Sequence, residues 1–131
     1  MKVNILLCDT FPGLLPTHIA SYVSMFTLMF NSVQENVTYE IYDVRYQRFP
    51  PSLNHEELYL ITGSNFGVYD NIPWVKALMS FVRYAHEKEA KFVGVCFGHQ
   101  IIAEALGGKV ERSEKGWGTG IRTSCVLSEK A

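Results

Sequence analysis

A cysteine between two glycines is the residue in this chain best suited to covalent chemistry. Cys96 lies in the stretch GVCFGHQ, residues 94–100, directly after an apolar run and directly before a helix-like one. The spacing G-x-C-x-G is typical of a nucleophile elbow, a tight strand-to-helix turn that holds its nucleophile in a strained conformation outside the sheet. Gly94 and Gly98 leave the room that such a turn needs. Because amides at a helix start favour a thiolate, we predict that Cys96 is reactive.

Acyl transfer at this thiol also needs hydrogen-bond donors for the oxyanion that develops on the attacked carbonyl. The backbone amide of Phe97, next after Cys96, is the natural first donor. We expect the second donor from the turn at residues 62–65, TGSN, which follows an apolar run. There Gly63 lets the backbone approach and the amide of Ser64 donates. The prediction requires this turn to lie beside Cys96.

The other two cysteines, Cys8 and Cys125, lie in apolar runs without flanking glycines, and we expect inert core residues at both. The three cysteines are far apart, without a CxxC pair or histidines at ligand spacing. We therefore predict neither a disulfide framework nor a metal site, and no cofactor is indicated. A reducing, cytoplasmic environment suits this cysteine usage best.

Length and composition exclude several classes of protein. The chain has 131 residues, of which 47% are hydrophobic and 19% are charged, which indicates one globular domain over residues 1–131. The formal net charge of -1 gives no reason to expect binding to nucleic acid or to an acidic membrane. The N-terminal apolar run stops at Asp9, too early for a signal segment or a membrane span.

The elements that must position these residues alternate along the chain. We expect strands at residues 3–7, 37–44, 58–62 and 91–95, and helices at residues 16–30, 72–89 and 98–106. Residues 45–57 form a loop. This order predicts an α/β, flavodoxin-like, doubly wound and mainly parallel sheet with helices on both faces. In the strand order 2-1-3-4, the ends of strands one, three and four bring residues 8–10, residues 62–64 and Cys96 together.

The last part of the chain predicts a sheet that is incomplete at its C-terminal edge. The stretches KVER, residues 109–112, and IRTSCVL, residues 121–127, suggest two further strands joined by a glycine-rich turn. Little sequence follows to pair or cover the second strand. Because an unpaired strand edge can pair with another chain, it is a candidate contact for a partner or a second copy of the chain. The chain is interpreted as a single but partial domain.

Three stretches resemble the class I glutamine amidotransferase domains, particularly their stand-alone, GMP-synthase-like group. They are ITGSNFGVYD at residues 61–70, VGVCFGHQIIAEALGGKV at residues 93–110 and KGWGTGI at residues 115–121. The resemblance implies hydrolysis of a γ-glutamyl amide through a thioester on Cys96. It also implies an oxyanion hole from the amides of Ser64 and Phe97, and a glutamyl group held by Gln100. Ammonia would pass to a synthetase partner, although some stand-alone relatives instead cleave γ-glutamyl peptides such as glutathione.

One part of the family pattern is not found in the sequence. The family supplies the imidazole base and its orienting carboxylate from an H-x-E element well downstream of the cysteine, whereas the last histidine here is His99. On the predicted helix, His99 is carried away from the thiol, and His18 is a weak substitute. His55 and His86 are expected in a loop and at a solvated helix end. We therefore expect an incomplete triad in this chain.

Three functional hypotheses remain open at this point. The first is the nucleophilic part of a glutamine amidotransferase-like or γ-glutamyl peptide hydrolase. The second is a catalytically inactive module of the same fold that binds a γ-glutamyl ligand or a protein. The third is a site completed in trans, with the base delivered by another subunit.

Overall fold

The structure is a computed structural model of the chain, and it describes residues 1–10, 21–116, 118, 120, 121, 123 and 125. Four strands form one parallel sheet in the order β2-β1-β3-β4. The strands are β1 (Lys2–Leu7), β2 (Thr38–Asp43), β3 (Leu58–Ile61) and β4 (Lys91–Gly94). The predicted strand order and the parallel α/β architecture are confirmed.

The central position of β1 follows from its sequence. Its inner residues, VNIL, are all buried, as expected for a strand with neighbours on both edges and cover on both faces. Ile5 lies opposite Ile41 of β2 and Leu60 of β3 in the register. Because all strands run the same way, the carboxyl ends of β1, β3 and β4 meet at one edge of the sheet.

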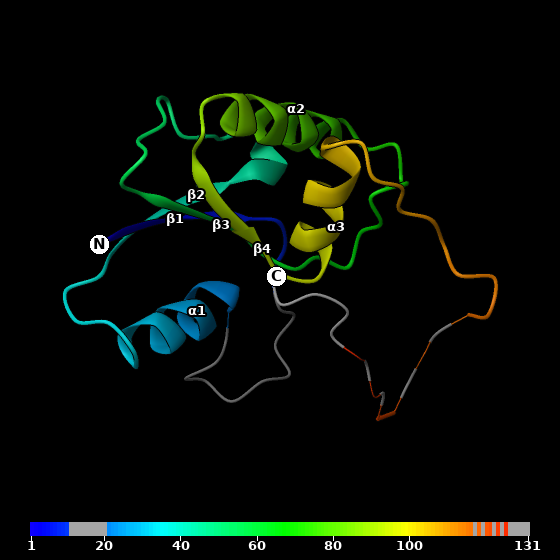
Figure 1. The fold of residues 1–131 in the computed structure, drawn as a ribbon, viewed down its shortest axis with the longest axis horizontal. Helices are drawn as coiled ribbons and strands as arrows, with labels where there is room; N and C mark the ends of the chain where they lie inside the picture. The colour runs from blue at the N-terminus through cyan, green and yellow to red at the C-terminus, as the bar shows by residue number, and fades with distance from the viewer. Residues whose placement is uncertain (11–20, 117, 119, 122, 124, 126–131) are drawn as a thin grey trace.

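Helices cover both faces of the sheet, as predicted (Figure 1). Helix α1 (Tyr22–Asn31) packs on one face, and α2 (Pro73–Glu87) and α3 (Phe97–Ala105) pack on the other. Helix α1 begins with a capping box, in which the Ser21 hydroxyl accepts a hydrogen bond from the Ser24 amide at 3.1 Å. Helix α2 begins with Pro73. Proline has no backbone N–H, and it is tolerated in the first turn because N–H groups there have no acceptor within the helix.

Alternation along the strands divides the core in two. On the α1 face, Val3, Ile5 and Leu60 pack with Phe26. On the opposite face, the neighbouring strand residues pack under α2 and α3, in a cluster that includes Leu6, Ile61, Leu78, Val82, Phe97 and Ile101. Successive side chains of a strand point to opposite faces of the sheet, so the two faces of these buried strands pack against different helices.

The bounds of several elements differ from the prediction. Helix α1 begins at Tyr22, and the first part of the predicted helix, residues 16–20, lies outside the described residues. The predicted loop after β2 begins with a short 3-10 helix, η2 (Val44–Tyr46). The Asp43 side chain caps it by accepting a hydrogen bond from the Arg45 amide at 3.2 Å. An acceptor side chain at this point stabilises a local turn that the sequence pattern alone did not indicate.

The strand predicted at residues 109–112 is wrong. This segment has no regular secondary structure, and the amide of Val110 donates to the Glu104 carboxylate at 2.7 Å instead of to a neighbouring strand. Within the described residues β4 therefore pairs only with β3. Most of the strand predicted at 121–127 lies outside the described residues, and its described members Ile121, Thr123 and Cys125 belong to no strand.

The described helices are too short or too polar to cross a bilayer. The longest of them, α2, has 15 residues and is amphipathic, with its apolar side against the sheet.

Candidate active site

The turn between β4 and α3 holds Cys96 in a strained conformation. Cys96 has φ 55° and ψ -108°, a region that residues with a side chain rarely occupy. A Cβ atom added at Gly94 would lie 2.3 Å from the backbone of Gly98. One added at Gly98 would lie 2.3 Å from the Ile61 carbonyl oxygen. The turn thus has the geometry of a nucleophile elbow, and both glycines are required by close backbone contacts.

The three thiols have different environments. Cys96 is exposed and occupies the N-cap position of α3, where its side chain makes no cap hydrogen bond. Cys8 is completely buried, and this burial raises the pKa of its thiol from 9.0 to about 12. Cys8 is therefore a core residue, as its sequence predicted. Cys125 is exposed, so the prediction of a core residue there is wrong.

The end of β1 anchors the turn that follows β3. The Ser64 hydroxyl donates to the Cys8 carbonyl at 3.2 Å, and the Asn65 amide donates to the Asp9 carboxylate at 2.8 Å. Among the described residues, the amides of Ser64 and Phe97 have no hydrogen-bond acceptor. Two backbone donors next to the elbow are therefore available to a ligand.

Buried polar groups lock the ends of β1 and β3 together. The Thr62 hydroxyl is buried, accepts from the Cys8 amide at 2.9 Å and donates to the Gly63 carbonyl at 3.1 Å. Beside them, the Arg45 guanidinium lies 3.8 Å from the Asp9 carboxylate. The same guanidinium donates closer hydrogen bonds to the Asp43 carboxylate, and these bonds lower the pKa of the Asp43 carboxyl group.

A cavity of about 540 Å³ opens in front of the elbow. It is lined by Tyr22, Ser64, Asn65, Phe66, Gly67, Tyr69, Asp70, Cys96, Phe97, Gln100 and Arg112. The structure thus brings Ser64, Cys96, Phe97 and Gln100 to one cavity, as the sequence predicted. Gly63, which was predicted for the same site, is not among the lining residues, and a Cβ added there would meet the Tyr22 hydroxyl at 2.9 Å. Burial is the main cause that raises the pKa of Tyr22.

Two aromatic side chains that line this cavity pack against the same tryptophan of α2. Phe97 is buried against Trp74 of α2, with ring centroids 5.7 Å apart. Trp74 also meets the edge of Phe66 at 5.7 Å. Since Phe66 belongs to the turn after β3, this stack fixes the turn relative to the elbow.

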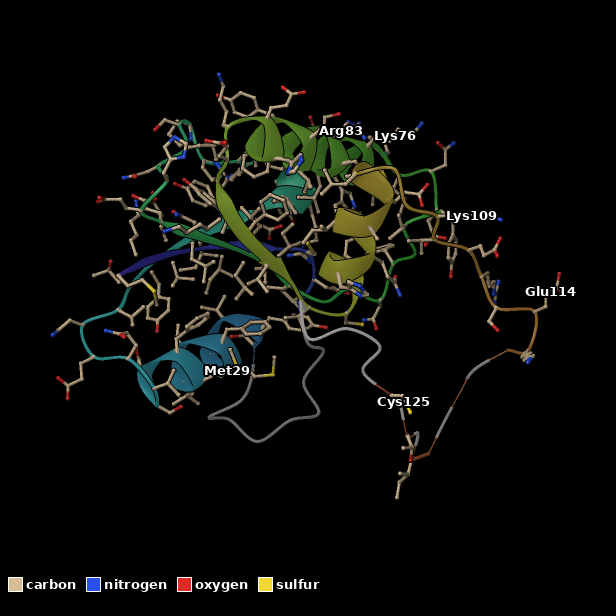
Figure 2. The ribbon with its side chains drawn as sticks, in the orientation of Figure 1. Met29, Lys76, Arg83, Lys109, Glu114 and Cys125 are labelled. Carbon is tan, nitrogen blue, oxygen red and sulfur yellow. The ribbon has the colours of Figure 1, made fainter. Side chains whose placement is uncertain are left out.

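A second cavity of about 270 Å³ adjoins the first. Tyr69, Gln100 and Arg112 line both. The remaining lining comes from the segment after α3, on which Figure 2 labels Lys109 and Glu114.

The family model described as Glutamine amidotransferase class-I matches residues 21–130. This chain belongs to the class I glutamine amidotransferase family.

Several curated proteins are similar to the chain in sequence. The Saccharomyces cerevisiae protein YLR126C, named provisionally as a glutamine amidotransferase, is 39% identical over 98 residues, which cover 68% of this chain and 39% of that protein. Gamma-glutamyl peptidase 4 of Arabidopsis thaliana is 38% identical over 64 residues, which cover 49% of this chain and 26% of that protein. Gamma-glutamyl peptidase 3 of the same plant is 27% identical, with 82% and 43% covered. The chain thus spans less than half the length of these relatives.

Solved glutamine amidotransferases share the fold. A Thermotoga maritima structure matches 81% of this chain and 43% of its own, with a TM-score of 0.59 and 19% identity. A Methylobacillus flagellatus structure also has a TM-score of 0.59, with 20% identity, and covers 86% of this chain and 41% of its own.

Three of the four histidines lie among the described residues, and none of these three lines the cavity of Cys96. His99 is exposed on α3, and His55 and His86 are exposed elsewhere, while His18 lies outside the described residues. In the described part of the chain, no hydrogen bond joins a histidine to Cys96, and no cluster of three or more His, Cys, Asp or Glu side chains could hold a metal ion.

Sequence reasoning missed several residues that line the cavity of Cys96. Tyr22 begins α1, and the rule that a helix after a strand starts at the carboxyl edge of the sheet could have placed it there. Tyr69 and Asp70 lie in the loop after Gly67, where no periodic pattern indicates a direction. Arg112 is in the segment predicted as a strand, so its place on the cavity wall could not follow from that prediction.

Proposed function

We propose that this chain carries the nucleophilic part of a γ-glutamyl amide hydrolase, with Cys96 as the nucleophile. The observation that carries the proposal is the position of Cys96 at positive φ on the elbow, in a cavity that it shares with Ser64, Phe97 and Gln100. Membership in the class I glutamine amidotransferase family supports the choice of substrate class.

The proposed reaction proceeds through two acyl-transfer steps. The Cys96 thiolate attacks the γ-carbonyl carbon, and the resulting oxyanion accepts hydrogen bonds from the amides of Ser64 and Phe97. Collapse breaks the carbon–nitrogen bond, and the leaving amine departs with a proton. Water then attacks the γ-glutamyl thioester, which releases glutamate and restores the thiol. Gln100 holds the glutamyl group throughout.

The proton transfers need a general base and acid beyond the groups described. We assign this function to an H-x-E element of the kind that the family resemblance implies, which the residues after Cys96 in this sequence do not contain. Within the chain, the exposed thiol and the amides at the start of α3 supply the nucleophile and the stabilisation of charge.

Glutamine and γ-glutamyl peptides contain the same scissile γ-carbonyl. The similarity to proteins named gamma-glutamyl peptidases favours a peptide substrate, and the similarity to YLR126C favours glutamine. The test incubates the chain with glutamine or with glutathione, quenches in acid and measures intact mass. A glutamyl adduct on Cys96 that is absent from Cys96→Ser supports the proposal, and the substrate that forms it identifies the leaving group. No adduct with either substrate, even at saturating concentration, contradicts the proposal for the chain alone.

Completion of the site by another subunit is a second proposal, favoured by the open side of β4. Val93 and Val95 are 41% and 38% exposed, and within the described residues only β3 pairs with this strand. A second copy or a synthetase partner that adds to this edge would cover both side chains. Activity per molecule that rises with protein concentration supports this arrangement, and equal activity at all concentrations contradicts it.

A further inference from the structure

The Asp9 carboxylate that anchors the turn at residues 62–65 is nearly buried, with 12% of its side chain exposed. One of its oxygens accepts from the Asn65 amide at 2.8 Å, and the other accepts from the Thr10 amide at 2.8 Å. A carboxylate removed from water also needs a compensating cation, because burial of an unpaired charge is costly. Among the residues that the structure describes, the Arg45 guanidinium is the only cation that pairs with Asp9, at 3.8 Å.

The element that carries Arg45 fixes the position of this guanidinium. Arg45 lies in η2, directly after β2, and the preceding Val44 is completely buried in the core. The Asp43 carboxylate accepts from the Arg45 backbone amide at 3.2 Å and from the guanidinium at 2.9 Å and 2.6 Å. A two-point contact with a carboxylate sets the plane of a guanidinium as well as its distance. Asp43 thus directs the remaining nitrogen, Nη1, toward Asp9.

These contacts connect the ends of three strands. Asp43 ends β2, Asp9 follows β1, and Asn65 lies in the turn after β3. Arg45 and Asp9 do not line the cavity of Cys96, whereas Ser64 and Asn65 do. The contacts of Arg45 therefore reach the site through Asp9 and the turn.

We propose that Arg45 is a positioning residue, which keeps the Asp9 carboxylate in place and thereby fixes the turn that presents the Ser64 amide to the cavity of Cys96. This inference rests on the proposed function, in which that amide stabilises the oxyanion. A donor of this kind acts because it is held in place before the reaction begins. Loss of Arg45 therefore weakens oxyanion stabilisation while the thiol itself is unchanged.

Amide hydrogen exchange measures the effect of Arg45 on the turn without any reaction at Cys96. In Arg45→Gln we expect the Asn65 amide to exchange about threefold faster than in the wild type, the size expected for a partly exposed ion pair. Exchange at Ile5, in the middle of β1, should not change. Unchanged exchange at Asn65 overturns the proposal. Equal acceleration at Asn65 and Ile5 also overturns it, since this result indicates a general loss of stability.

The matched control is Arg48→Gln. Arg48 has the same charge, lies three positions further along the chain and is exposed. This variant should exchange as the wild type does at Asn65. The same acceleration at Asn65 in Arg48→Gln overturns the proposal, because it shows an effect of net charge and not of the contact with Asp9.

Alkylation of Cys96 measures the consequence for the reaction. The chloromethyl ketone analogue of glutamine forms an oxyanion when the thiol attacks, whereas iodoacetamide does not. The ratio of the two rate constants, measured by mass spectrometry, therefore depends on the oxyanion donors and not on the reactivity of the thiol. We expect this ratio to fall about threefold in Arg45→Gln, in proportion to the looser turn. A ratio equal to that of the wild type overturns the positioning role.

A double-mutant cycle tests whether Arg45 acts through Asp9. If it does, Arg45→Gln has no further effect once Asp9→Asn has removed the charge, so the double variant should have the same ratio as Asp9→Asn alone. Effects that multiply overturn the proposal, because they assign Arg45 a role independent of Asp9. Failure of wild-type Cys96 to react with the ketone overturns the proposed function instead, and the exchange rates at Asn65 then still decide whether Arg45 fixes the turn.

Discussion

The carboxylate of Asp9 accepts a hydrogen bond from the backbone amide of Asn65 at 2.8 Å, across a separation of 56 residues. Asp9 follows β1, and Asn65 lies in the turn after β3. The same carboxylate accepts from the Thr10 amide at 2.8 Å. One buried side chain therefore fixes the turn that presents the Ser64 amide to the cavity of Cys96.

Asp9→Asn should loosen this turn without unfolding the chain. The variant removes the charge that strengthens both hydrogen bonds, which costs about 1 kcal/mol. Alkylation of Cys96 by a glutamyl ketone should slow about fivefold relative to iodoacetamide, because only the ketone depends on the oxyanion donors. The ratio of the two rates is measured, with Glu56→Gln at an exposed carboxylate as the control. A ratio equal to that of the wild type would show that Asp9 does not position the turn.

Gly98→Ala should be strongly destabilising. The added methyl group would lie 2.3 Å from the Ile61 carbonyl, a backbone atom that cannot move without disturbing β3. We expect the free energy of unfolding to fall by about 3 kcal/mol or more. Denaturant titration measures the change. Gly118→Ala, at a glycine with nothing within 4 Å, is the matched control and should change stability little. Equal effects of the two substitutions would contradict the close contact.

The fold could be predicted because its signals are local and agree with one another. The buried run of β1, the alternation of β2 and the apolar stripe after Pro73 each specify an element, and parallel pairing then fixes which strand ends meet. The strand prediction at residues 109–112 is wrong because a strand forms only where a neighbouring strand pairs with it. Its sequence permits a strand, but the Glu104 side chain takes the Val110 amide.

The centre of the candidate site could also be predicted, whereas its rim could not. Gly94, Cys96 and Gly98 lie in one turn, so their spacing in the sequence predicts the geometry of that turn. Tyr22 and Arg112 reach the cavity from distant elements, and no spacing relates them to Cys96. Placement of such residues depends on loop paths and on packing across the sheet edge, which short-range patterns do not contain.

Burial of Cys8 predicts a loss of stability at high pH. The pKa of its thiol is raised from 9.0 to about 12 in the folded chain. Between these values the unfolded chain releases the proton while the folded chain retains it, so stability is unaffected below pH 9 and falls as pH rises toward 12. The slope from this thiol is about 1.4 kcal/mol per pH unit. Urea titrations from pH 8.5 to 10.5 should give a shallower slope for Cys8→Ala, and identical slopes would contradict the assignment.

Thr62→Val should destabilise the junction of β1 and β3. The substitution preserves the shape of the side chain but leaves the Cys8 amide without its acceptor and the Gly63 carbonyl without its donor. Leaving buried groups unpaired costs about 1–3 kcal/mol. Thermal unfolding should show a lower midpoint for this variant, whereas Thr62→Ser retains the hydroxyl and should lose less. A serine variant as unstable as the valine variant would point to packing instead of hydrogen bonding.

Selective labelling of Cys96 tests the central claim most directly. The chain contains its own control, because Cys96 and Cys125 are both exposed thiols and only Cys96 lies on the elbow. The intact chain is treated with the glutamyl chloromethyl ketone near neutral pH, and peptide mapping measures the rate at each cysteine. We predict that Cys96 reacts at least tenfold faster than Cys125 and that glutamine protects it. Equal rates at the two cysteines, with no protection by glutamine, would contradict a nucleophile built to attack a γ-glutamyl carbonyl.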